Sequence, residues 1–151
     1  MFPERSEPYE VKVFEGAKSN QVFGDLTVKY TEINHNPKLF KSASFRLEGE
    51  EKSIAYSGDC GYDERLEILS SGSDIGLYEM SLSVEKYTKN GPVPNHLSPY
   101  ECGVIAKKAG IKTLVLVHWY DDSEQQAVLT EVRKNFRGTI IIPEDMETVE
   151  W

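Results

Sequence analysis

Residues 98–118 read SPYECGVIAKKAGIKTLVLVH and carry the clearest fold signal in the sequence. This segment opens with a capping box, Ser98 followed by Glu101, and has a proline at the first helical position and a glycine as its stop, so it predicts a helix over 98–109. The apolar run that follows predicts a buried strand over 112–117. A helix followed directly by an apolar strand is typical of an α/β domain in which helices cover a sheet.

The rest of the second half repeats this alternation. Asp121 with Glu124 forms another capping box and predicts a helix over 122–136. A strand over 138–142 and a last edge strand over 147–151 are expected to follow. The helices each carry one apolar stripe at four-residue spacing, which favours packing against a sheet.

The first half is richer in strands. A charged turn over 48–52 joins two apolar segments and predicts a hairpin. Gly91-Pro92-Val93-Pro94 is the densest cluster of breakers, so we expect a loop over 84–95. The predicted elements of this half are strands around 11–13, 26–30, 43–47, 53–56 and 75–80, and a helix over 62–69. No internal repeat or linker divides the chain, and we expect a single domain over 1–151.

Composition narrows the class of protein. The chain has 151 residues, 39% of them hydrophobic and 28% charged, which is typical of one globular domain. Its apolar runs are far shorter than the roughly 20 residues of a membrane helix. No signal segment opens it, so a soluble, cytoplasmic protein is expected. The net charge of −8 disfavours general binding to nucleic acid. Cys60 and Cys102 stand far apart and are expected to be buried free thiols.

Polar side chains follow the predicted strands. The chain has three histidines, His35, His96 and His118, and all lie at strand ends or helix starts. Asp59 and His118 both follow apolar strands, and side chains at the carboxyl ends of parallel strands meet in a crevice. Imidazole nitrogen and carboxylate oxygen are ligands of zinc and similar ions, so the two are suited to bind a metal.

Each of these residues also has an ordinary structural interpretation. A histidine at a strand end is usually a hydrogen-bonded surface residue, and Asp59 after a glycine is a typical turn residue. His96 could simply precede a helix cap. Glu79, on an otherwise apolar strand, is equally suited to bind backbone groups or to act as a functional acid.

Four ordered stretches favour the functional interpretation through a resemblance. They are IAYSGD at 54–59, DIGLYE at 74–79, NHLSPYECGVIA at 95–106 and TLVLVH at 113–118. Together they resemble the C-terminal half of the metallo-β-lactamase-fold hydrolases, and among these the ribonuclease Z and phosphodiesterase branch. The resemblance covers roughly residues 25–151, and the ordered set is far more specific than any single motif.

The resemblance implies a role for each polar residue. Asp59 matches the carboxylate that bridges two metal ions, and His118 matches the last histidine ligand. His35 resembles a third histidine ligand, although its interval to the following strand is longer than the branch usually has. His96 resembles the histidine that lies beside the scissile phosphate and protonates the leaving oxygen. The implied cofactor is a pair of divalent ions, zinc first, with manganese or iron as alternatives.

The family's His-x-His-x-Asp-His motif is missing from these 151 residues. The resemblance therefore implies the C-terminal half of a four-layer αββα sandwich, inactive alone, with the inner face of its sheet uncovered. We expect that face to be covered by a chain that supplies the N-terminal half, by a second copy, or by more of a longer parent protein. The implied function is that of a metal-dependent phosphodiesterase. The alternatives are a non-catalytic, dimerising half-domain and an unrelated α/β domain.

Overall fold

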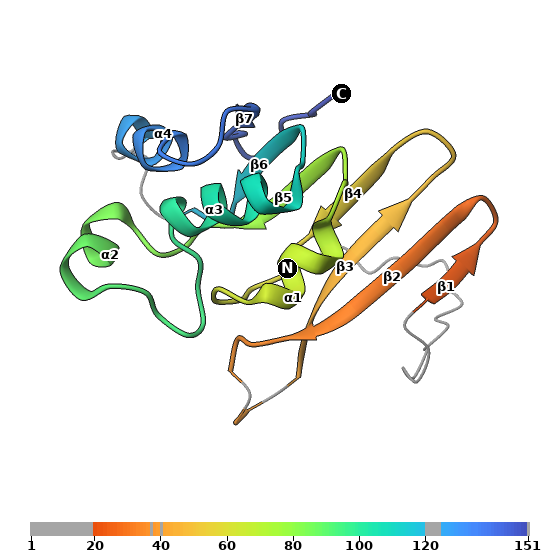
Figure 1. The fold of residues 1–151 in the computed structure, drawn as a ribbon, viewed down its shortest axis with the longest axis horizontal. Coiled ribbons are helices and arrows are strands. Elements are labelled where there is room, and N and C mark those ends of the chain that lie inside the picture. The colour runs from red at the N-terminus through yellow and green to blue at the C-terminus, as the bar shows by residue number, and fades with distance from the viewer. Residues whose placement is uncertain (1–19, 37, 40, 120–124, 151) are drawn as a thin grey trace, which may run out of the picture.

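The computed structural model describes residues 20–150 apart from 37, 40 and 120–124. Seven strands form one sheet whose spatial order follows the order of the chain (Figure 1). Neighbouring strands are antiparallel from β1 to β4 and parallel from β4 to β7. The strands are β1 (Asn20–Phe23), β2 (Leu26–Ile33), β3 (Ser42–Glu48), β4 (Ser53–Tyr56), β5 (Ile75–Glu79), β6 (Thr113–Val117) and β7 (Thr139–Ile141). The helices are α1 (Glu64–Ser70), α2 (Val84–Asn90), α3 (Pro99–Ala109) and α4 (Gln125–Arg133).

The core lies between the sheet and three of the helices. Leu66 of α1, Ile105 of α3 and Val132 of α4 are fully buried. They belong to one apolar cluster with Tyr78 of β5 and Leu114 of β6. Figure 1 shows α1 and α3 in front of the same face of the sheet. The apolar stripes predicted for the last two helices are thus confirmed as core-facing.

The opposite face of the sheet is apolar as well. Registered partners across neighbouring strands point to the same side, and residues next to them along a strand point to the other. Because Leu114 faces the helices, its partner Gly76 does too, while Leu77 and Val115 face away. We call this second surface the helix-free face, since no described helix packs on it. It carries the apolar side chains Val28, Tyr30, Phe45, Leu47, Ile54, Tyr56, Leu77 and Val115.

Polar residues of β2 and β3 lie on the helix side instead. Lys29 pairs with Glu48 at 2.6 Å, and Arg46 donates to the backbone of the end of α1. The apolar stripe of these two strands therefore points away from the helices. Phe45 and Tyr56 on the helix-free face are 38% and 37% exposed.

The α3 cap forms as the sequence predicts. The Ser98 Oγ accepts from the backbone N–H of Glu101, and the Glu101 carboxylate accepts from the backbone N–H of Ser98. Gly110 ends the helix at φ 68°, a left-handed conformation that glycine adopts without strain. The hairpin through residues 48–52 is confirmed by the antiparallel pairing of β3 and β4.

Two predicted elements are wrong. Part of the loop expected over 84–95 is the helix α2, because Ser83 caps it and the breakers begin only at Gly91, where the helix ends. Residues 147–150 form no strand, because the chain turns back on itself when the backbone N–H of Glu147 donates to the Glu144 carbonyl.

Two predicted features fall on residues that the structure does not describe, and a third prediction concerns membrane helices. The strand around 11–13 and the capping box of Asp121 and Glu124 both lie outside the described residues. Of the helices that the structure describes, none has the length and apolar character needed to cross a bilayer.

Candidate functional site

Three acidic or imidazole side chains gather at one edge of the sheet. Strands β4, β5 and β6 are parallel, so their carboxyl ends lie side by side. Asp59 follows β4, Glu79 ends β5 and His118 follows β6. The Asp59 Oδ1 lies 3.1 Å from the His118 Nδ1, and the Glu79 Oε2 lies 4.0 Å from the same nitrogen. The predicted meeting of Asp59 and His118 is thus present in the structure.

Special backbone geometry aims both side chains at this edge. Gly58 has φ +60°, and a Cβ there would lie 2.8 Å from the carbonyl oxygen of Ala43, so only glycine fits before Asp59. His118 itself has φ 60°, which is uncommon for a residue with a side chain and costs about 1–3 kcal/mol. Such strain is found chiefly at functional sites.

Glu79 lies buried beneath the site and joins its parts. Its side chain is 2% exposed. The Oε1 accepts from the backbone N–H of Leu97 at 2.9 Å and of Cys60 at 3.4 Å. The Oε2 accepts from the backbone N–H and the hydroxyl of Ser81 at 2.8 and 2.7 Å. Glu79 therefore fixes the turns that carry Asp59 and His96. The sequence had allowed either a structural or a functional role for Glu79, and these hydrogen bonds give it the structural one.

His96 is held through its Nδ1. That nitrogen lies 2.6 Å from the Ser81 Oγ and 3.3 Å from the Glu79 Oε1. The Ser81 hydroxyl uses its proton to donate to Glu79, so in the contact with His96 the Ser81 oxygen accepts. The Nδ1 of His96 is therefore protonated and donates to Ser81. This assignment follows from the hydrogen bonds and leaves the Nε2 of His96 as the nitrogen that can exchange a proton with a ligand.

His35 lies beside His96 and is held by the backbone before it. Its Nδ1 lies 2.7 Å from the carbonyl oxygen of Asn95, and because a carbonyl only accepts, this nitrogen is the donor. The rings of His35 and His96 lie 5.1 Å apart between centroids, and those of His96 and His118 lie 6.1 Å apart. The ring of His96 thus lies next to the rings of both predicted histidine ligands.

The donors fit a divalent ion in kind but are too few in number. Imidazole and carboxylate are suitable ligands, and a catalytic zinc ion takes three protein ligands plus water. Among the described residues, no three His, Cys, Asp or Glu side chains are arranged to hold one ion. The Asp59–His118 pair is therefore a partial ligand set.

The two cysteines are unsuited to this chemistry. Both are free and buried, as predicted. Burial, followed by the charge of Glu79, raises the pKa of the Cys60 thiol well above its usual range, and burial does the same for Cys102. Both thiols therefore stay protonated near neutral pH and act as small apolar core residues.

This fold and this edge of polar side chains define a half of the metallo-β-lactamase sandwich. The sequence model of the beta-lactamase superfamily domain matches residues 2–119. The chain belongs to this superfamily, which binds divalent metal ions.

Curated proteins are similar to part of this chain. An uncharacterized protein of Mycobacterium tuberculosis is 34% identical over 88 residues, 58% of this chain and 31% of that protein. A ribonuclease Z of Ignicoccus hospitalis is 30% identical over 102 residues, 66% of this chain and 33% of that enzyme. The chain thus spans about a third of the length of these curated relatives.

Solved structures share the fold. The metallo-beta-lactamase fold protein YhfI from Bacillus subtilis superimposes with a TM-score of 0.75 at 20% identity, covering 88% of this chain and 52% of that one. The short form of human tRNase Z gives a TM-score of 0.64 at 19% identity, covering 87% and 46%. The predicted fold, the C-terminal half of the αββα sandwich, is confirmed.

Sequence reasoning missed part of the site. Ser81 was not singled out, although it links His96 to Glu79. The available signal was a carboxylate at the end of a buried apolar strand, since a charged group is rarely buried without partners.

Proposed function

We propose that this chain supplies the C-terminal half of a metal-dependent phosphodiesterase of the ribonuclease Z type. Asp59 and His118 would hold metal ions, with His35 as a further ligand. The observation that carries the proposal is the contact of Asp59 with His118 beside His96, whose outer nitrogen the buried Glu79 and Ser81 leave available. The ribonuclease Z likeness supports the same substrate class.

His96 would act as the proton donor. In phosphodiester hydrolysis, water adds to phosphorus and the bond from phosphorus to the leaving oxygen breaks, which leaves an alkoxide that needs a proton. The Nε2 of a protonated His96 can deliver it, since Nδ1 is held by Ser81. Metal ions held by Asp59 and His118 would lower the pKa of a bound water toward about 7, so that the water would lose its proton to solvent and attack as hydroxide.

The remaining ligands must come from outside these residues. With the His-x-His-x-Asp-His motif missing from the sequence, we propose that the metal site is completed by the N-terminal half of the fold. The helix-free face supports this, because it presents an apolar surface of the kind that a second sheet covers in a sandwich about 10 Å across.

The proposed metal binding by Asp59 and His118 is tested by calorimetry. We expect zinc or manganese to bind the wild-type chain, and Asp59→Ala and His118→Ala to weaken that binding at least 10- to 100-fold, the loss typical of groups around a metal. Asp25→Ala removes an exposed carboxylate from the turn between β1 and β2 and serves as the matched control. Unchanged affinity in both site variants would remove Asp59 and His118 from the metal site.

The catalytic half needs an activity assay. Hydrolysis of a phosphodiester should be measured with the chain alone and with an added polypeptide that carries the His-x-His-x-Asp-His motif. We expect activity only in the mixture, and its loss in His96→Ala. Activity that is identical in His96→Ala would exclude the proton-donor role.

A second candidate is a non-catalytic module that dimerises through its sheet. The apolar stripe of β2 and β3 on the helix-free face favours it, since exposed apolar surface of this kind marks interaction sites. A mixture that binds no metal and hydrolyses no phosphodiester, while the chain forms dimers, would favour this function.

A further inference from the structure

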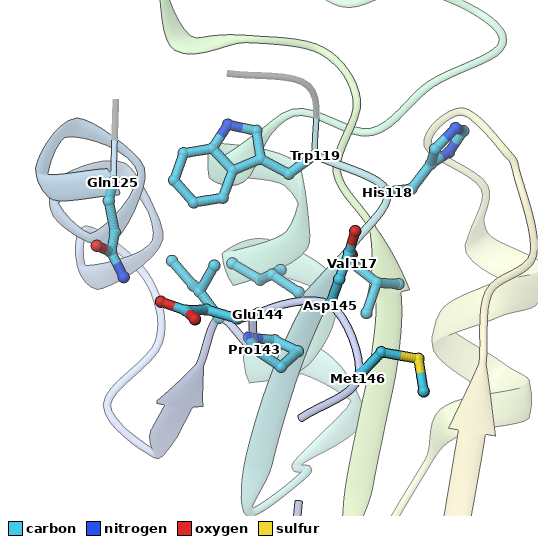
Figure 2. A pocket seen from close by; sticks show the side chains of 10 residues that line it. Val117, His118, Trp119, Gln125, Pro143, Glu144, Asp145 and Met146 are labelled. Carbon is cyan, nitrogen blue, oxygen red and sulfur yellow. The ribbon is translucent and has the colours of Figure 1, made fainter. Parts of the chain in front are cut away.

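A pocket of about 750 Å³ opens where β6 and β7 end. This volume lies within the roughly 300–1,000 Å³ of small-molecule sites. Residues of β6, of the start of α4 and of the segment after β7 line it. Figure 2 shows the side chains of Trp119, Gln125 and Glu144 around it, while His118 points away. We call it the Trp119 pocket.

The chemistry of the lining is aromatic and acidic. Trp119 presents a flat ring, and Glu144 and Asp145 supply carboxylates that only accept hydrogen bonds when ionised. Among the described residues that line the Trp119 pocket there is no lysine or arginine. The lining therefore repels a phosphate group and suits a flat ring that carries N–H donors.

The Trp119 ring and the backbone of Glu144 are held in place before any ligand arrives, while the Glu144 side chain is exposed. Trp119 is partly buried and packs against the apolar core, so its ring is a fixed platform. Glu144 starts a closed turn: its backbone N–H donates to the Glu147 carboxylate at 2.9 Å, and its carbonyl accepts from the Glu147 N–H at 3.1 Å. A preorganised site loses less entropy when it binds.

The position of the Trp119 pocket ties it to the proposed phosphodiesterase site. The side chain of His118 points away from the pocket toward Asp59, while Trp119, the next residue in the chain, points into the pocket (Figure 2). One ligand could therefore place a phosphate beside the histidines and an adjoining ring over Trp119.

We propose that the Trp119 pocket binds an amino-bearing heteroaromatic ring of the substrate, stacked on Trp119 with its amino group donating to Glu144. This inference rests on the proposed function, because it takes the ring to belong to the phosphodiester whose leaving oxygen His96 would protonate. An adenine or cytosine base has this chemistry, since its exocyclic amino group is a donor that a carboxylate can accept.

The test uses adenosine, which carries no phosphate, and the full chain without metal, in equilibrium dialysis. We expect saturable binding that weakens about tenfold in Glu144→Ala, through loss of a hydrogen bond to a charged group. Trp119→Ala should weaken it by about tenfold or more, the loss of one base–aromatic stack. Trp119→Phe keeps a stacking ring and should retain most of the affinity even though Trp119 also packs on the core. Glu150→Ala, which removes an exposed carboxylate from the same segment outside the pocket, is the matched control.

Inosine separates the amino group from the ring, because it has a carbonyl oxygen at that position. We expect inosine to bind the wild-type chain more weakly than adenosine does. The Glu144→Ala variant should bind the two nucleosides with equal affinity. No adenosine binding, binding unchanged in Glu144→Ala and Trp119→Ala, or equal binding of the two nucleosides would overturn the proposal. The adenosine experiment contains no metal, so a negative result in it does not affect the conclusion about metal binding by Asp59 and His118. A negative zinc titration likewise does not affect the conclusion about adenosine binding.

Discussion

Glu79 is the residue whose role the structure changes most. On the sequence it is a lone carboxylate on an apolar strand, and in the fold it accepts hydrogen bonds from three backbone N–H groups and one hydroxyl. These donors belong to the turns after β4 and β5 and to the segment that carries His96. A buried carboxylate with this many donors holds separate turns in one arrangement.

We expect Glu79→Gln to lower the free energy of unfolding by about 1–3 kcal/mol. The amide keeps one acceptor oxygen, but its NH₂ group would face N–H donors and leave a buried group unsatisfied. Urea unfolding measures the change. Glu50→Gln, in the exposed turn between β3 and β4, should stay within about 0.5 kcal/mol of wild type. Equal stability of Glu79→Gln and wild type would contradict this account.

At this scale the sequence predicts positions better than partners. Asp59 and His118 could be placed together because both follow apolar strands, and the carboxyl ends of parallel strands meet at one edge of a sheet. The ring contacts of His96 with His35 and His118 could not be predicted, since they depend on how the loop before α3 returns to the sheet edge. The partners of Glu79 could not be predicted either, because most of them are backbone N–H groups, which nearly every residue type has.

Asp74 shows how elements are joined at the opposite end of the parallel strands. Its carboxylate accepts from the backbone N–H and hydroxyl of Ser53, at the start of β4, and from Lys112, just before β6. The hydrogen bond from Lys112, followed by those from Ser53, holds the pKa of Asp74 below its usual value of 3.8. The ionised carboxylate therefore ties the amino ends of two strands to β5.

We expect Asp74→Asn to be less stable than wild type at pH 7 and to lose less stability on acidification. Because the pKa of Asp74 is lowered in the folded state, its contribution is complete above the usual aspartate value and is lost as the pH falls through the lower, folded-state value. Urea unfolding in steps from pH 7 down to about pH 3 measures the convergence. Asp25→Asn is the control, and parallel pH profiles for wild type and Asp74→Asn would refute the assignment.

The elements were predictable where local signals agreed. The cap of α3 and the glycine that ends it were predicted at the residues where the structure has them. The helix α2 was missed because the breakers at 91–94 lie so close to it that they dominate the local pattern, although they only end the helix. The strand expected over 147–151 failed in its described part, because the turn of Glu144 and Glu147 directs the chain away from β7.

On the scale of the whole molecule, the sheet has two apolar faces and helices on only one of them. The helix-free face holds the apolar stripe of β2 and β3, and its aromatic side chains Phe45 and Tyr56 remain more than a third exposed. Strands β5 and β6 carry apolar side chains on both faces, which is typical of a sheet that is buried on both sides. This is the physical basis for expecting a partner surface.

We expect the chain alone to self-associate through this face and Phe45→Lys to reduce the association. A lysine at this position places a charge in the middle of the apolar surface, where burial without a partner is costly. Sedimentation equilibrium over a range of concentrations measures the effect. Thr31→Lys adds the same charge to the other face of β2 and should associate as wild type does. A wild-type chain that stays monomeric throughout would contradict the prediction.

The sequential order of the seven strands has a consequence for how the sheet is built. Each strand after β1 pairs with the one made just before it, so every closure spans only a turn or a single crossover. Short closures cost little chain entropy, and topologies rich in them fold quickly. The sheet can therefore extend strand by strand from the amino end during synthesis, without waiting for a partner that emerges much later.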